Sequence, residues 1–126
     1  MSSTPSPTLD VTIDGSEREL FMSFGLLNEL VTLIGGPDNV AAIVGDPELR
    51  EAVLFATLSE RSKTGKVTKA VTDIFDVEIS TEDAEAVLEW VMANAIAFFM
   101  RSLKRVVKVV EPHKATIEEL ASSPNG

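Results

Sequence analysis

The chain has 126 residues, 44% of them hydrophobic, and a formal net charge of −9 from 11 Lys and Arg against 20 Asp and Glu. This length fits one domain of ordinary size, and a chain this apolar should form a core. The negative charge argues against generic binding to nucleic acid or to an anionic membrane, since both would repel the surface. We therefore expect one acidic domain with neither of these among its partners.

Residues that support catalysis or metal binding are scarce. The chain has no Cys, which excludes a disulfide, a thiolate metal site and a cysteine nucleophile. Its single histidine, His113, lies in a polar tail without the rigid supporting shell that a catalytic or zinc-binding imidazole needs. Thr64–Lys66 has only the end of a phosphate-binding loop, and no spacing sets two carboxylates across a cleft. We expect no enzyme, no cofactor and no metal.

The N-terminal part predicts an arm followed by a hairpin. Residues 1–8 are rich in Ser, Thr and Pro and have neither the basic start nor the apolar run of a secretory signal, so we expect a flexible arm. Apolar and polar residues alternate over Leu9–Ile13, and Asp14-Gly15 favours a tight turn into a returning arm over Glu17–Met22. Because a two-stranded hairpin is marginal alone, it should pack on helices.

Three helices are predicted next. Ser23 as N-cap and Gly35 as stop delimit a largely buried helix over Phe24–Ile34. A short helix over about Asn39–Val44 follows, and Asp46-Pro47 then provides an N-cap and a first-turn proline for a helix over residues 48–59.

The middle of the chain is ambiguous. The polar stretch Glu60–Gly65 predicts an exposed loop. Five apolar residues after it have the i, i+3, i+4, i+7, i+8 spacing of an amphipathic helix: Val67, Ala70, Val71, Ile74 and Phe75. Phe75, Val77 and Ile79 also alternate as a strand would, so the sequence leaves helix and strand open over 66–79.

The C-terminal third predicts one long helix. Ser80 with Asp83 resembles a capping arrangement and opens a helix to about Val106. No charge occurs between Trp90 and Met100, and a helix apolar all round must be surrounded by its own domain or by another chain. This uncharged run is shorter than the roughly 20 residues that a bilayer requires. Residues 111–126 are expected to be a flexible tail or linker, with one or two helical turns over Thr116–Ala121.

Two faces of this long helix are unusual. The acidic stripe of Glu82, Glu85 and Glu89 continues as an apolar one, through Ala93, Ile96, Met100 and Leu103. A basic stripe lines the last turns, through Arg101, Lys104, Arg105 and Lys108. It either complements the helix macrodipole or forms a docking stripe for an acidic partner. Trp90, Phe98 and Phe99 are core residues by default and interface anchors as the alternative, because they cannot all point into one small core.

The fold class is therefore mainly α: a small helical domain over 9–110 with a short N-terminal β-hairpin and one long C-terminal helix. Up to residue 60, ten acidic residues face only two basic ones, Arg18 and Arg50, whereas the remainder is close to neutral. A partner surface is expected on that second part.

Three groups of residues resemble the tail assembly chaperones of long-tailed bacteriophages. They are Met22-Ser23-Phe24-Gly25-Leu26-Leu27-Asn28-Glu29-Leu30, Asp46-Pro47-Glu48-Leu49-Arg50, and Ile79-Ser80 with Trp90 and Phe98-Phe99. The likeness spans roughly Val11–Lys104. In that family the turn before the paired phenylalanines carries acidic residues and a histidine, whereas this chain has Ala93, Asn94 and Ala97. The helix of this chain is therefore more apolar than is usual in that family.

The resemblance implies a non-enzymatic factor in the cytoplasm of the infected host. Such proteins coat the long tape measure protein, help recruit tail tube protein and are absent from the finished tail. A frameshifted longer form would make the segment after Pro112 a linker. We take as candidate contact or self-association residues Trp90, Ile96, Phe98, Phe99 and Met100, and as steering charges Arg101, Lys104 and Arg105.

Two other functions fit the same pattern. A helical virion adaptor of the tail or head-tail connector would use the same apolar helix but stay in the particle. A small DNA-binding regulator could read a groove with the basic stripe, although the net charge opposes this.

Overall fold

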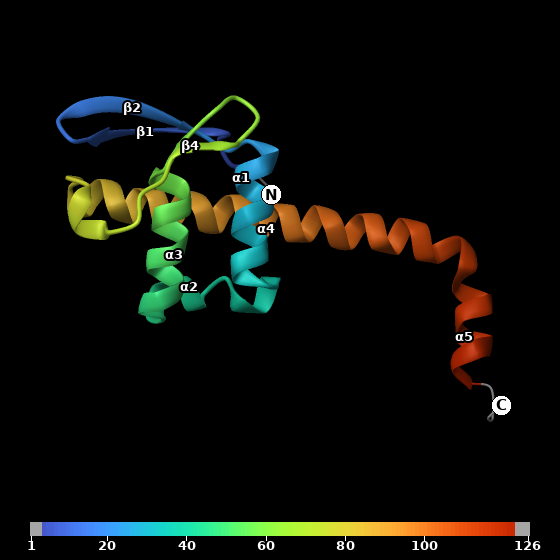
Figure 1. The fold of residues 1–126 in the computed structure, drawn as a ribbon. Helices are drawn as coiled ribbons and strands as arrows, with labels where there is room; N and C mark the ends of the chain where they lie inside the picture. The colour runs from blue at the N-terminus through green and yellow to red at the C-terminus, as the bar shows by residue number, and fades with distance from the viewer. Residues whose placement is uncertain (1–3, 123–126) are drawn as a thin grey trace.

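The structure, a computed structural model, describes residues 4–122. It opens with the predicted antiparallel hairpin of β1 (Thr8–Ile13) and β2 (Ser16–Phe21). Asp14 and Gly15 have φ angles of 52° and 79°, the left-handed conformation that a two-residue hairpin turn requires. Alternate residues of the hairpin face the core: Val11, Ile13 and Leu20. Figure 1 shows the hairpin lying over the ends of the helices.

Helices α1 (Phe24–Ile34) and α3 (Pro47–Leu58) pack side by side under the hairpin (Figure 1). Their predicted caps are confirmed: the Ser23 Oγ accepts from the Leu26 N–H, and the Asp46 carboxylate from two N–H groups of the first turn of α3. The short helix expected over 39–44 is displaced. It is a 3₁₀ turn, η1 (Pro37–Asn39), followed by one turn of α-helix, α2 (Ala42–Gly45).

The amphipathic helix considered for 66–79 is wrong. The segment has β4 (Val67–Lys69), paired with β3 (Glu60–Arg61), and a 3₁₀ turn, η2 (Ile74–Asp76). Outside the 3₁₀ turn, several of its backbone groups bond to other segments: the Val71 N–H donates to the Ser59 Oγ at 2.9 Å. The strand alternative holds for β4, whereas over residues 75–79 it holds only for a single bridge between Ile79 and Ile13.

The predicted loop is exposed at four of its six residues, Glu60, Ser62, Lys63 and Thr64, but an arginine fixes it to the body. The side chain of Arg61 is only 9% exposed. Its guanidinium donates to the carbonyls of Ala56 and Gly65 and to the carboxylate of Glu29. It therefore joins the C-terminus of α3, the β3–β4 turn and α1, a long-range role that a local polar sequence does not reveal.

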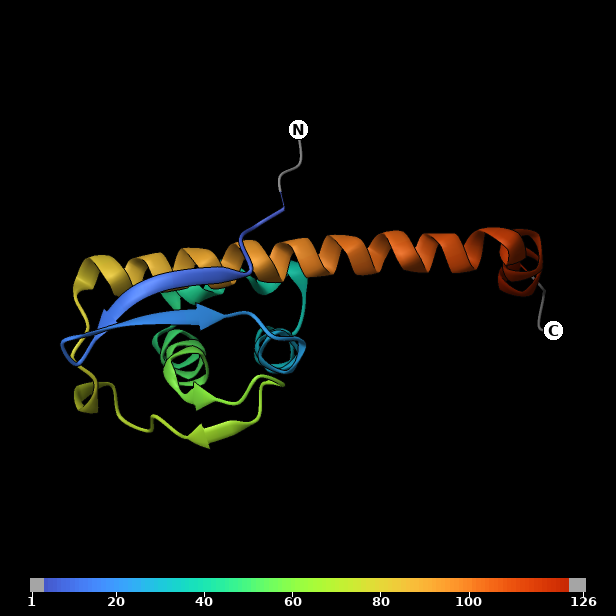
Figure 2. The ribbon, with the colours of Figure 1, turned by 90° about the horizontal axis from the view of Figure 1, so that it is seen from above.

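Helix α4 (Thr81–Val110) is the longest element and crosses α1 and α3. The Ser80 Oγ accepts from the Asp83 N–H, which confirms the predicted start. The first half buries a face in the core: Val87, Trp90, Val91, Asn94 and Ala95. The second half extends beyond the body, as Figure 2 shows from above.

The helix ends later than the predicted Val106, at Val110, because no helix-breaking residue precedes Pro112. A 3₁₀ turn, η3 (Glu111–His113), leads into α5 (Lys114–Ser122), which points away from the axis of α4 in Figure 1. Pro112 lacks the N–H that would bond one turn back, which accounts for the bend. Up to Ser122 the segment expected to be a flexible tail is helical in the structure.

Candidate functional site

Residues 96–110 form the outer half of α4, and we call this half the stem. Most of its apolar side chains are exposed. Val87 and Val91 in the first half are fully buried, whereas Val107 is 61% exposed. Five exposed apolar residues follow one another at intervals of four and three along the stem: Ile96, Met100, Leu103, Val107 and Val110. This spacing sets them in one stripe on the helix surface. An exposed contiguous apolar stripe is typical of an interaction site.

The stripe lies on the solvent side of the helix. It continues the line of Glu82, Glu85 and Glu89, all of which are exposed in the first half. The core-facing line of Val87, Val91 and Asn94 continues in the stem through Phe98, Arg101 and Arg105, so it changes from apolar to basic. The apolar stripe therefore points away from the protein's own core and is not an extension of it.

The four basic residues of the stem are exposed and make no ion pair within residues 4–122. Lys108 lies in the last turn of α4, where the macrodipole favours a cation. Arg101 lies about two and a half turns before the end of the helix at Val110, and the dipole effect falls off within the last turn. The macrodipole thus accounts for Lys108, while Arg101, Lys104 and Arg105 remain candidates for a docking role.

Trp90 is not on this surface, which corrects its assignment as a contact residue. It is 7% exposed, and its indole Nε1 donates to the Ser6 carbonyl oxygen at 2.8 Å. The Asn94 Nδ2 donates to the same oxygen at 3.3 Å and to the Trp90 carbonyl at 3.0 Å. The arm expected to be flexible over 1–8 is therefore attached to α4 at Ser6, where the stem begins to leave the body.

The other predicted residues occupy two places. Phe98 and Phe99 are half-buried against the edge of the core and pack edge to face, with ring centroids 6.0 Å apart. Four predicted residues line one shallow hollow of about 370 Å³ beside Thr4 and Pro5: Ile96, Met100, Arg101 and Lys104. The structure thus brings together two apolar and two basic candidates, while Arg105 lies outside this hollow.

A larger apolar groove was not predicted. It measures about 840 Å³, and its apolar lining comes from α2, α3, η2 with its flanking residues, and α4: Val44, Leu54, Ile74, Phe75, Val77, Ile79, Ala84, Leu88 and Met92. Phe75 is 93% exposed and Val44 is 65% exposed at its edge. Glu85 and Glu89 lie on its α4 side. Because four separate segments form the groove, the periodicity within any one of them could not predict it. The one local signal was Phe75, a large apolar residue between the polar residues Asp73 and Asp76.

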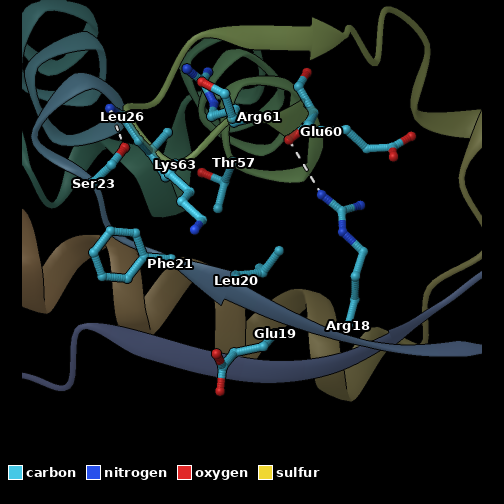
Figure 3. Close-up of a pocket in the computed structure, with 12 residues that line it drawn as sticks. Arg18, Glu19, Leu20, Phe21, Ser23, Leu26, Thr57, Glu60, Arg61 and Lys63 are labelled. Atoms are coloured by element: carbon cyan, nitrogen blue, oxygen red, sulfur yellow. Dashed lines mark hydrogen bonds between the residues drawn. The ribbon is translucent and has the colours of Figure 1, made fainter.

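A third cavity, of about 500 Å³, lies between β2 and β3 and is lined by both polar and apolar side chains (Figure 3). Arg18 points across it and donates to the carbonyls of Leu58 and Ser59 at 3.0 and 3.3 Å. Arg61 donates to the Ala56 carbonyl, as described above. Both guanidinium groups therefore bind carbonyl oxygens at the C-terminal end of α3. Within residues 4–122 no group of three or more His, Cys, Asp or Glu side chains could hold a metal ion.

By length and composition alone, the continuous helical stretch Thr81–Ala121 would be sufficient to cross a membrane. The core helix of a soluble protein passes the same test, and here the first half of α4 is packed in the core. The absence of a membrane partner stays a prediction.

In comparisons with known proteins, the chain matches no family model, and no curated protein or solved structure is significantly similar to it. The likeness to tail assembly chaperones therefore depends on the residues quoted above.

Proposed function

We propose that this protein is a non-enzymatic tail assembly chaperone of a long-tailed bacteriophage, which binds the tape measure protein in the host cytoplasm. The proposal combines the sequence resemblance with one structural observation, the exposed apolar stripe of the stem. A tape measure protein is expected to be a long helical chain with apolar stripes of its own. Helix-on-helix packing of two such stripes would remove both from water.

The distribution of charge supports the same function. Residues 1–95 carry six Lys and Arg against 17 Asp and Glu, so a client coated by these domains would gain negative charge. Mutual repulsion of the coated segments would keep the client dispersed. Arg101, Lys104 and Arg105 would steer acidic segments of the client to the stem.

The test is co-expression with the tape measure protein of the same phage. We expect the soluble yield of the tape measure protein to rise and the two proteins to co-purify. Leu103→Glu with Val107→Glu should abolish both effects, because it places charges in the stripe. Phe24→Glu is the matched control, since Phe24 is 72% exposed on α1, outside the stem. An unchanged yield without co-purification would contradict the proposal.

Analysis of purified phage particles separates this function from that of a virion adaptor. A chaperone should be absent from the particle, whereas an adaptor would be present in a fixed copy number. Recruitment of the tail tube protein, through this chain or a frameshifted longer form, is part of the proposal. It can be measured by adding purified tube protein to the chaperone–tape measure complex.

A further inference from the structure

The stem and the body carry opposite net charges. Residues 96–110 hold four Lys and Arg and no acidic residue, whereas residues 1–95 are strongly acidic. The acidic residues include Glu85 and Glu89, which are exposed beside the apolar groove. The stem is thus apolar and basic, whereas the groove is apolar, is bordered by Glu85, Glu89 and Arg50, and belongs to a body with a strongly negative net charge. These are complementary surfaces for docking.

The stem does not reach the groove of its own chain. Both belong to the same helix: Met92 lines the groove and Leu103 lies eleven residues further along. At about 1.5 Å per residue, the two are separated by roughly 16 Å along the axis. Figure 2 shows α4 running without a break from the body into the stem. The complementary surfaces can therefore meet only between two molecules.

The groove has the apolar lining that an amphipathic helix needs. Its volume of about 840 Å³ is bordered by three helices and η2, and its lining is largely apolar. The stem offers side chains at i, i+4 and i+7, the spacing by which an amphipathic helix fills such a groove: Ile96, Met100 and Leu103, or Met100 and Val107 one heptad apart. Lys104 borders the stripe, so it would lie near the glutamates of the rim.

We propose that the stem of one copy docks into the groove of a second copy. Charge argues against the alternative, a symmetric contact in which two stems pair with each other. Stem-to-stem pairing would bring two basic segments together, whereas stem-to-groove docking brings a basic segment to a strongly acidic body. Docking would also cover Phe75 and Val44, the exposed apolar residues at the edge of the groove.

The contact is head-to-tail. Each copy has one stem and one groove, so a molecule that fills the groove of its neighbour still offers its own groove to another. Such a heterologous contact leads to a ring or to an open chain of copies, not to a closed two-fold dimer. The average mass of the purified protein should therefore rise past that of a dimer as its concentration increases.

The test uses two full-length variants that each lose one surface. Leu103→Glu with Val107→Glu disables the stem, and Val44→Lys with Phe75→Lys disables the groove. All four positions are exposed, so the fold should survive, which circular dichroism and thermal unfolding would verify. Phe24→Lys is the matched control, because it changes another exposed phenylalanine, which lies outside the groove.

Sedimentation equilibrium should give three results. Each double variant alone is monomeric at concentrations where the unaltered chain and Phe24→Lys associate. An equimolar mixture of the two double variants forms a 1:1 complex and grows no further, because it contains one functional stem and one functional groove. Association weakens from about 0.1 M to about 1 M salt, as the Debye length falls from about 10 Å to about 3 Å.

Other outcomes would overturn the proposal. Stem-to-stem pairing predicts that the groove variant still dimerises, that the mixture forms no new complex, and that salt strengthens association. A monomeric unaltered chain at every concentration would refute any self-association. Because the experiment uses the purified chain alone, its failure would leave the tape measure proposal standing. Conversely, if the unaltered chain failed to bind the tape measure protein, the contact between copies would still stand.

Discussion

The two halves of α4 belong to one continuous helix but have opposite environments. The first half is packed against α1, α3 and β1 through Val87, Val91 and their neighbours, whereas the stem has no other element beside most of its length. Apolar residues occur in both halves at helical spacing. The difference is in the side on which they lie: toward the core in the first half and away from it in the stem. A helical apolar pattern thus indicates burial without saying by which molecule.

The largest effect should come from placing a charge in the buried half of α4, and the same change in the stem gives the comparison. Val91→Asp buries an unpaired carboxylate in the core and should cost about 4 kcal/mol or more, which would leave the protein unfolded or nearly so. Val107→Asp, on the exposed stem, should change the free energy of unfolding of the monomer by less than about 0.5 kcal/mol, measured at concentrations below those at which copies associate. Urea unfolding measures both. Equal costs would mean that the stem is buried in solution.

Loss of the Arg61 guanidinium should be the next largest effect, because it weakens the body but not the stem. Arg61→Met keeps much of the length of the side chain but leaves the carbonyls of Ala56 and Gly65 without a donor, at a cost of about 2–3 kcal/mol. Lys69→Met removes only an exposed ion pair with Glu60 and should cost less than about 0.5 kcal/mol. A thermal denaturation series would compare them, and similar melting temperatures would contradict this role of Arg61.

A smaller effect is expected at the junction of the two halves. Trp90→Phe removes the indole donor to the Ser6 carbonyl and leaves a small gap, which should cost about 1–2 kcal/mol. Hydrogen exchange should show faster exchange at Thr8 and Met22, where the arm joins the hairpin, than in the unaltered protein. Thr72→Ala, a substitution away from this junction, serves as a control. Unchanged exchange near the arm would show that the bond does not hold it.

The smallest effect is expected at the outer end of the stem. Pro112→Ala restores a backbone donor and should allow α4 to continue into α5 with less bend. Helical content should increase slightly, while the free energy of unfolding changes by less than about 0.5 kcal/mol, because this region packs on no core residue. Circular dichroism would measure the first and urea unfolding the second. A large loss of stability would show that the bend supports the body.

Local signals predicted much of the fold. The turn at Asp14-Gly15, the caps at Ser23, Asp46 and Ser80, and the stop at Gly35 depend on chemistry within a few residues, and the structure confirms each. The segment 66–79 could not be predicted in this way. Its apolar residues pack against the core from a backbone whose hydrogen-bond partners, such as Ser59 and Asp14, lie in other segments of the chain.

The candidate site divides in the same manner. Sequence periodicity identified the stripe and the basic residues of the stem, since a helix sets their positions by itself. It misplaced Trp90, whose partner Ser6 is 84 residues away, and it missed the groove, which four segments build together. Helical geometry and capping are local, so the sequence alone determined that a long helix with an acidic-to-apolar face exists. Which half of that helix is buried depends on packing between distant elements, and only the tertiary structure decided it.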